Sequence, residues 1–239
     1  HTRSDRDWSS DVCSSDLMQN DVYDYTSQGS VAKNTVLQKT YRLLGLSFIP
    51  AVAGAFFSAK TGFNIFAMFG SYYVALAAFF GFFYGMTFLI EKNRYSNVGV
   101  ALLMIFTFGM GLAISPMLQY ALAINNGAQI VGTAAAMTAG VFFTMSAMAR
   151  RTTMNMNKLG SFLGAGAIVL MIAVVANIFL NIPALSLTIA AGFVVFSSLM
   201  IMWQVRTVID GGEDSHISAA LTLFVAIYNI FTGLLRTLL

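Results

Sequence analysis

Long hydrophobic runs separated by short polar stretches make up most of the chain. Each run is long enough to cross a bilayer, because a helix needs about 20 mostly apolar residues to span the ~30 Å hydrocarbon core. The pattern therefore predicts an all-α fold, a bundle of seven transmembrane helices. The predicted spans are residues 41–59, 65–90, 97–124, 128–149, 160–180, 184–206 and 217–237.

The polar segments outside these runs are short and leave no room for a soluble domain. Residues 18–40 are polar and predict a cytoplasmic N-terminal tail. Residues 1–17 are Ser/Asp-rich and resemble a translated sequencing-adapter string. We therefore expect residues 1–17 to be a non-native leader that is not part of the fold, with Met18 as the start of the protein. The alternative is a native disordered tail. Cys13, the only cysteine, lies in this leader, so disulfide and thiolate chemistry have no candidate in the spans.

Basic residues in the connections predict the orientation. Only 10% of the residues are charged, against about 25% in a soluble domain. Lys and Arg prefer cytoplasmic loops. With the N-terminus inside, nine basic residues fall on the cytoplasmic side and only Lys60 and Arg236 fall outside. The predicted topology is therefore N-in, C-out, and the basic surplus reports orientation, not nucleic-acid binding. The nine are Lys33, Lys39, Arg42, Lys92, Arg94, Arg150, Arg151, Lys158 and Arg206.

Acidic groups are missing from the predicted spans. Intramembrane proton and ion relays use carboxylates, histidines or cations held among helices. The sequence also lacks a Walker lysine loop and the HExxH and GxSxG motifs. We therefore predict a protein that is not an enzyme and that holds no cofactor and no metal. The acidic residues after the leader all lie in the tail or in a connection: Asp21, Asp24, Glu91, Asp210, Glu213 and Asp214.

The connection at 210–214 carries three carboxylates in five residues. Such a turn can attract a divalent cation at the surface, but its spacing does not match the EF-hand loop. A solvated connector is the favoured interpretation.

Glycine spacing predicts where helices pack closely. Gly81 and Gly85 in the second span, and Gly160 and Gly164 in the fifth, have the small-xxx-small spacing that lets helix backbones approach each other. We expect these positions to lie at packing surfaces inside the bundle.

The third span contains a proline in a glycine-rich setting. Pro116 cannot donate a hydrogen bond to the preceding turn, so it predicts a kink. Together with Gly109, Gly111 and Ser115 it forms a candidate hinge or a bend around a cavity. A static packing kink is the alternative.

The last two spans carry polar side chains. Gln204 lies in the sixth span, and Tyr228 and Asn229 lie in the seventh. Amides inside a membrane commonly form hydrogen bonds between helices. The other interpretation makes these three residues the lining of a polar cavity or gate.

Three segments carry a resemblance to a known family. GMGLAISPMLQYALAINNGAQIVGTAAAMTAGVFF at 109–143 resembles the signature of the Bax inhibitor family of seven-span membrane proteins. ANIFLNIPAL at 176–185 and GGEDSHISAALTLFVAIYNIF at 211–231 resemble its YccA-like bacterial branch. The resemblance extends from about residue 36 to residue 239.

The resemblance implies a multi-pass protein of the bacterial inner membrane that binds and restrains the membrane-anchored AAA protease FtsH. Under that reading the chain is a regulator whose partners are the lipid bilayer and FtsH. Other branches are described as pH-sensitive calcium leaks, gated by two aspartates on the last two helices. The corresponding positions here align with Gln204 and Ala226, which do not titrate. A calcium leak with an altered gate therefore remains the alternative function.

Overall fold

The computed structural model describes residues 14–64 and 66–239, with side chains described from residue 35 onward except at positions 65 and 72. Most of the expected leader, including Cys13, lies outside the described residues. The described residues form seven long helices and one short 3₁₀ turn, and no strand. All seven helices are long and apolar enough to cross a membrane, which confirms the predicted fold class. The elements are α1 (Ser14–Thr61), η1 (Ala67–Phe69), α2 (Tyr72–Lys92), α3 (Asn97–Ala123), α4 (Gly127–Arg151), α5 (Met156–Leu180), α6 (Pro183–Asp210) and α7 (His216–Leu238).

Helix ends follow the turn residues in the sequence. The Asn155 side chain accepts hydrogen bonds from two backbone amides at the start of α5, and the Ser215 hydroxyl accepts one at the start of α7. Pro183 occupies the first turn of α6, where its missing N–H costs nothing. Gly211 ends α6 with a φ of 81°, a left-handed conformation that glycine adopts without strain.

The second helix begins later than the apolar run predicts. The expected span starts at residue 65, whereas α2 starts at Tyr72. Gly62 and Gly70 both have positive φ, at 68° and 63°, and they bracket the short η1 turn. Hydrophobicity alone does not distinguish this apolar loop from the helix that follows it.

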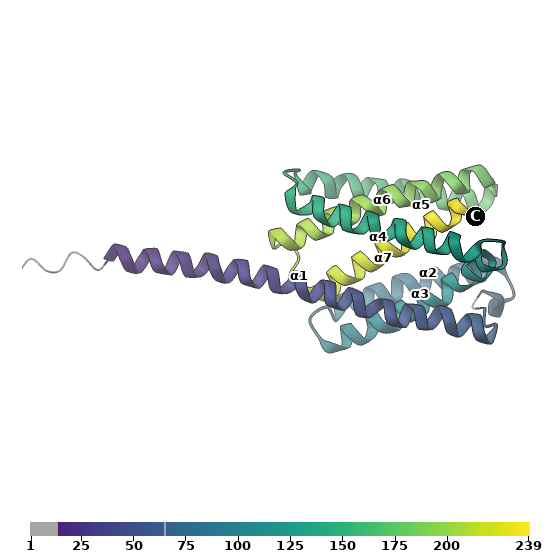
Figure 1. Ribbon diagram of the computed structural model, residues 1–239, viewed down its shortest axis with the longest axis horizontal. Helices are drawn as coiled ribbons and strands as arrows, with labels where there is room; N and C mark the ends of the chain where they lie inside the picture. The colour runs from purple at the N-terminus through teal and green to yellow at the C-terminus, as the bar shows by residue number, and fades with distance from the viewer. Residues whose placement is uncertain (1–13, 65) are drawn as a thin grey trace, which may run out of the picture.

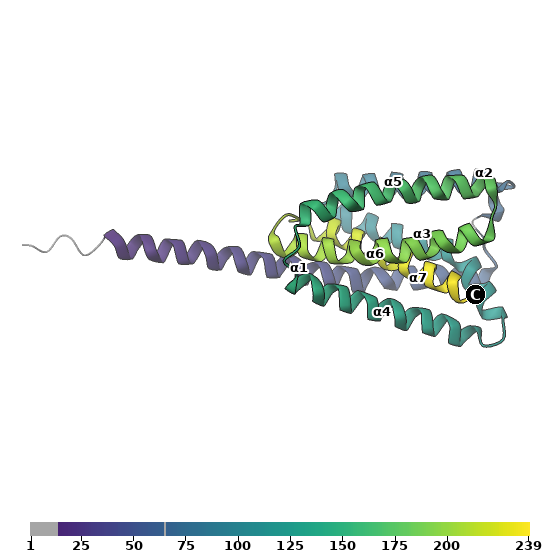
Figure 2. The ribbon, with the colours of Figure 1, turned by 90° about the horizontal axis from the view of Figure 1, so that it is seen from above.

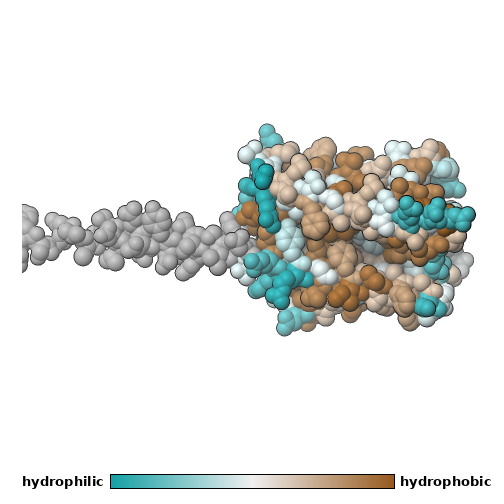
Figure 3. Space-filling model, viewed as in Figure 1, coloured by the Kyte–Doolittle hydropathy of each residue, from teal (hydrophilic) through white to brown (hydrophobic). Residues whose placement is uncertain are grey.

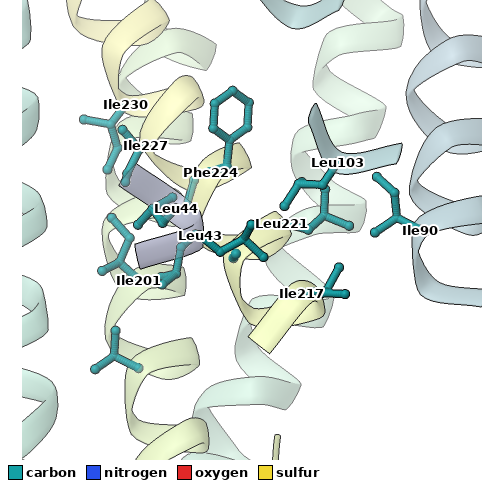
Figure 4. Close-up of a cluster of buried hydrophobic side chains, with 14 of the residues drawn as sticks. Leu43, Leu44, Ile90, Leu103, Ile201, Ile217, Leu221, Phe224, Ile227 and Ile230 are labelled. Carbon is teal, nitrogen blue, oxygen red and sulfur yellow. The ribbon is translucent and has the colours of Figure 1, made fainter. Parts of the chain in front are cut away.

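The last helix is the centre of the bundle. More than half of the α7 span is buried, the largest share of the seven, whereas α5 lies at the periphery (Figures 1 and 2). Helices α1, α3, α4 and α6 all pack against α7. Figure 4 shows the core around it, where Leu44 of α1, Leu103 of α3 and Ile201 of α6 gather near Leu221 and Phe224 of α7.

The surface has the distribution of a membrane protein. Figure 3 shows hydrophilic residues gathered at the two ends of the bundle and hydrophobic residues over the middle. Large apolar side chains such as Phe88, Phe143 and Phe179 are exposed on this middle zone. Water would not tolerate so much exposed apolar surface, but hydrocarbon does.

The two ends of the bundle differ in charge. One end carries the α2–α3, α4–α5 and α6–α7 connections, and the N-terminal part of α1 projects beyond it (Figure 1). We call it the basic end, because the nine basic residues of the predicted cytoplasmic set lie in these connections, in the helix turns beside them or in the N-terminal part of α1. Lys60 and Arg236 lie toward the opposite end, with the C-terminus. The N-in, C-out topology stays a prediction.

Of the four glycines predicted by spacing, only Gly160 lies at a close contact between helices, where an added methyl group would lie 3.0 Å from the Nε1 atom of Trp203 on α6. A methyl group added at Gly81, Gly85 or Gly164 would meet no atom within 4 Å, so these positions do not mediate close approach and the prediction for them was wrong. The tightest contacts are between α1 and α3. A methyl group at Gly111 would lie 2.0 Å from the carbonyl oxygen of Ala51, and one at Gly54 would lie 2.3 Å from that of Phe108.

The candidate hinge residues of α3 lie in this packed region. Gly109 faces the ring of Phe82, and Gly111 faces the α1 backbone. The Ser115 hydroxyl donates to the carbonyl of Ala55 at 3.2 Å, across to α1. Helix α3 continues past Pro116 to Ala123. These residues therefore share packing contacts with α1 and α2, and a hinge motion stays a prediction.

Candidate functional site

A large groove lies between α1 and α4, whose backbones stay apart. The rings of Tyr41 on α1 and Phe142 on α4 meet edge to face across it, with centroids 6.1 Å apart. We call it the α1–α4 groove. Helices α1 and α4 form its walls, residues of α3 and α7 form its floor, and its volume is about 1140 Å³. Its lining is almost entirely apolar along its length and reaches Arg150 and Arg151 at the basic end.

A second cavity of about 1030 Å³ lies toward the opposite end of the bundle. We call it the polar cavity, because amides and hydroxyls from the end of α5, the start of α6 and α7 line it. Arg236 is the one charged residue in its lining. The polar side chains are Asn177, Asn181, Ser186, Asn229 and Thr232, with Tyr73 from α2.

The structure does not bring the three predicted polar residues into one cavity. Tyr228 lines the α1–α4 groove, where its ring stacks on Phe224 at a centroid distance of 6.3 Å. Asn229 lines the polar cavity. Gln204 lines neither. Successive residues of a helix point about 100° apart, so Tyr228 and Asn229 serve different surfaces of α7.

Gln204 and Ala226, the positions that align with the family's gate aspartates, lie in the packed core. Gln204 is 3% exposed and Ala226 is 2% exposed. Ala226 packs in the same apolar cluster as Ile201 and Val205, the latter next to Gln204 in the chain. The Nε2 atom of Gln204 has no hydrogen-bond partner in the described part of the chain.

We expect Gln204→Met to leave stability unchanged or to raise it slightly. An unsatisfied buried amide costs about 1–3 kcal/mol, and methionine fills a similar volume without a polar group. Thermal unfolding in detergent measures the effect. A loss of stability of the size seen for a broken buried hydrogen bond would show that Gln204 has a partner that this packing does not reveal.

An ion cluster joins two connections at the basic end. Arg94, in the α2–α3 connection, contacts Glu213 at 2.7 Å, Asp214 at 3.1 Å and Glu91 at 3.5 Å. The Tyr95 hydroxyl donates to Asp214 at 2.8 Å. We call these five residues the Arg94 cluster.

Two further hydrogen bonds extend the Arg94 cluster to the start of α7. The Ser215 hydroxyl donates to the carbonyl of Arg94 at 2.7 Å, and the Ser218 hydroxyl donates to Glu91 at 2.7 Å. The acidic turn therefore neutralises a cation of the chain, as Asp210 does for Arg206 at 2.9 Å. Across the described residues, no group of three or more metal-ligating side chains forms.

The Arg94 cluster lowers the pKa of one of its carboxylates, Asp214. The hydrogen bond from Tyr95 lowers the pKa of Asp214, and the contact with Arg94 acts in the same direction. The same hydrogen bond raises the pKa of Tyr95. Asp214 therefore stays ionised at neutral pH and holds the α6–α7 connection against the α2–α3 connection.

Fold, surface and site together define a multi-pass helical membrane protein whose described acidic side chains lie at helix ends or in connections. A family model described as "Inhibitor of apoptosis-promoting Bax1" matches residues 33–239. The chain belongs to this Bax inhibitor family, as its sequence motifs predicted.

Relatives in several bacteria match nearly the whole chain. A protein of Neisseria meningitidis serogroup A is 71% identical over 222 residues, which cover 93% of this chain and 97% of the relative. A protein of Pseudomonas aeruginosa is 38% identical over 201 residues, covering 84% and 87%. The Escherichia coli K12 protein named "Modulator of FtsH protease YccA" is 35% identical over 227 residues, covering 93% and 97%. These matches confirm the YccA-like resemblance and a multi-pass location in the bacterial inner membrane.

Proposed function

We propose that this chain is a non-enzymatic modulator of the membrane-anchored AAA protease FtsH. The observation that carries the proposal is its 35% identity, over 93% of its length, to a protein named as a modulator of that protease. Similarity over all seven spans, and not over one segment, favours a shared mode of action. The chain thus acts on another protein in the bilayer and not on a small substrate.

The shape of the molecule supports action through contact. The connections between its helices are short, so a partner within the membrane has to meet the helix faces. The N-terminal part of α1 projects beyond the basic end (Figure 1), and the preference of Lys and Arg for cytoplasmic loops supports a cytoplasmic location of that end. Under the proposal, this segment is exposed to the cytoplasmic part of the protease.

Co-purification tests the proposal. The tagged full chain is expressed in bacteria, solubilised in a detergent that retains other known membrane partners of FtsH, and captured. We expect FtsH in the eluate of this chain and not in that of a tagged multi-pass protein from another family. In the reciprocal experiment, FtsH carries the tag. If tagged FtsH then recovers its other membrane partners but not this chain, the proposal is contradicted.

A cation leak gains less support from the cavities. The polar cavity offers amide and hydroxyl oxygens, which can ligate cations, but its one charged lining residue is Arg236. A fixed positive charge in the lining repels cations. Neither cavity lining contains a carboxylate, and the positions of the family's gate aspartates are buried and uncharged. The leak therefore stays the alternative.

A further inference from the structure

The α1–α4 groove is open to the side of the bundle. Because the backbones of α1 and α4 stay apart and, among the described rings, only those of Tyr41 and Phe142 meet across the gap, the floor formed by α3 and α7 can be reached from between the two helices. Val52 on the α1 wall and Phe143 on the α4 wall are 67% and 69% exposed. In a bilayer, these walls face lipid, and so does the space between them.

The basic end of the groove carries two unpaired cations. Arg150 and Arg151 end α4, and both line the groove. Neither forms an ion pair with a carboxylate of the described chain, whereas Arg94 and Arg206 both do. The end of a transmembrane helix lies at the depth of lipid headgroups, so the two guanidinium groups stand where phosphates are found.

Two hydroxyl groups in the same groove also lack partners. Ser146 lies one turn before Arg150 on α4, is 7% exposed, and its Oγ atom makes no hydrogen bond within the described chain. The hydroxyl of Tyr41, on the α1 wall, is likewise buried and without a partner there. Buried hydroxyls are normally hydrogen-bonded, so these two groups indicate a ligand that supplies oxygen acceptors.

We propose that the α1–α4 groove binds an anionic phospholipid. An acyl chain lies along the apolar groove, and the phosphate lies between Arg150 and Arg151. The hydroxyls of Ser146 and Tyr41 donate to phosphate or ester oxygens. Basic pockets between transmembrane helices bind anionic headgroups in this way, and two fork-shaped guanidinium groups match the oxygens of a phosphate.

The chemistry of the lining favours a lipid over a helix of a partner protein. The two guanidinium groups and two hydroxyls that are unpaired in the described chain are hydrogen-bond donors, and a phospholipid headgroup supplies oxygen acceptors for them. The backbone carbonyls of a spanning helix are already paired within that helix. An acyl chain matches the apolar lining of the rest of the groove.

Lipid titration of purified variants tests the headgroup site. The full chain is purified in a mild detergent and delipidated, and its melting temperature is followed as phosphatidylglycerol or phosphatidylcholine with the same acyl chains is added. We expect phosphatidylglycerol to stabilise the protein at lower concentration. Arg150→Gln combined with Arg151→Gln should weaken that effect roughly tenfold, because each basic residue contributes substantially to binding anionic lipid.

The matched control removes the same charge from the same end outside the groove. Lys92 and Lys158 are exposed at the basic end, and neither lines the groove. Lys92→Gln combined with Lys158→Gln should leave the phosphatidylglycerol effect within about twofold of the unmodified chain. An equal loss in both double variants would overturn the proposal in favour of a diffuse charge effect. If inorganic phosphate alone stabilised the protein fully, the ligand would be a free anion, and the proposal of a phospholipid would be overturned.

Filling the groove tests the acyl-chain site. Gly45 and Ala139 are exposed and line the groove on α1 and α4, and a methyl group at Gly45 would meet no atom within 4 Å. Gly45→Phe with Ala139→Phe should abolish phosphatidylglycerol binding without unfolding the protein, while Gly164→Phe on α5 should preserve it. If the Gly45→Phe, Ala139→Phe variant still bound phosphatidylglycerol but no longer recovered FtsH, the groove would be a binding site for a helix of the partner protein and not for a lipid. Because FtsH recovery is measured separately, failure of the lipid proposal leaves the proposed function standing.

Discussion

Replacing Gly111 with alanine is expected to lower the free energy of unfolding by about 3 kcal/mol. The added methyl group would lie 2.0 Å from the carbonyl oxygen and 2.8 Å from the carbonyl carbon of Ala51. Both are backbone atoms of α1, so neither can rotate away as a side chain would. Relieving the contact requires α1 and α3 to separate, and overpacking of a filled core costs on the order of 1–3 kcal/mol or more.

The matched control is Gly45→Ala, in the same pair of packed helices. The new methyl group there meets no atom within 4 Å, and alanine favours a helix over glycine by about 1 kcal/mol. The two substitutions are chemically identical but should change stability in opposite directions. Thermal unfolding in detergent measures both. Equal stability of the two variants would contradict the close α1–α3 contact.

Removing the guanidinium of Arg94 is expected to cost roughly 2 kcal/mol at neutral pH, because three carboxylates would be left beside one another without a cation. Arg94 contacts all three at 2.7–3.5 Å and is itself half-buried. Lys92→Ala provides the control, since it removes a positive charge two residues away that forms no ion pair in the described chain. Arg94→Ala should therefore unfold at a clearly lower temperature than Lys92→Ala.

The pH dependence of this difference has a definite sign. The folded protein lowers the pKa of Asp214 from its ordinary value of 3.8. A carboxylate with a lowered pKa stabilises the fold above the pKa of the unfolded chain, and this contribution is lost as the pH falls through the folded value. The difference in unfolding temperature between the unmodified chain and Arg94→Ala should be largest at pH 7 and should shrink below about pH 4. A gap that widened toward acid pH would contradict the ion cluster.

The seven spans could be predicted from the sequence because run length alone determines whether a helix crosses a bilayer. The starts of α3, α6 and α7, at Asn97, Pro183 and His216, were also predicted to within one residue. The start of α2 was not, because the loop before it is as apolar as the helix.

The contacts between helices could not be predicted from the sequence pattern. Neither Gly54 nor Gly111 has a second glycine four residues away in its helix, and the contact that requires them joins α1 to α3, so glycine spacing within one helix gives no signal. Arg94 pairs with Glu213, 119 residues away. Opposite charges in two loops hinted at such a pair, but only the fold shows which loops meet.

The polar residues of the last two spans illustrate the same limit. Their sequence positions suggested one cavity, but a helix turns about 100° per residue, which separates Tyr228 from Asn229. Gln204 lies apart from both, in the packed core. The α1–α4 groove was missed altogether, because it exists only where the backbones of two helices that are distant in sequence stay apart.

The central claim is that this chain modulates FtsH, and a reconstituted proteolysis assay tests it most directly. FtsH is incorporated into vesicles with a membrane-protein substrate, with this chain or with an equal amount of a multi-pass protein from another family, and ATP-dependent loss of the substrate is followed. The account predicts slower degradation in vesicles that contain this chain, by an amount that grows with its ratio to FtsH. A rate equal to that of the control vesicles at every ratio would contradict the account.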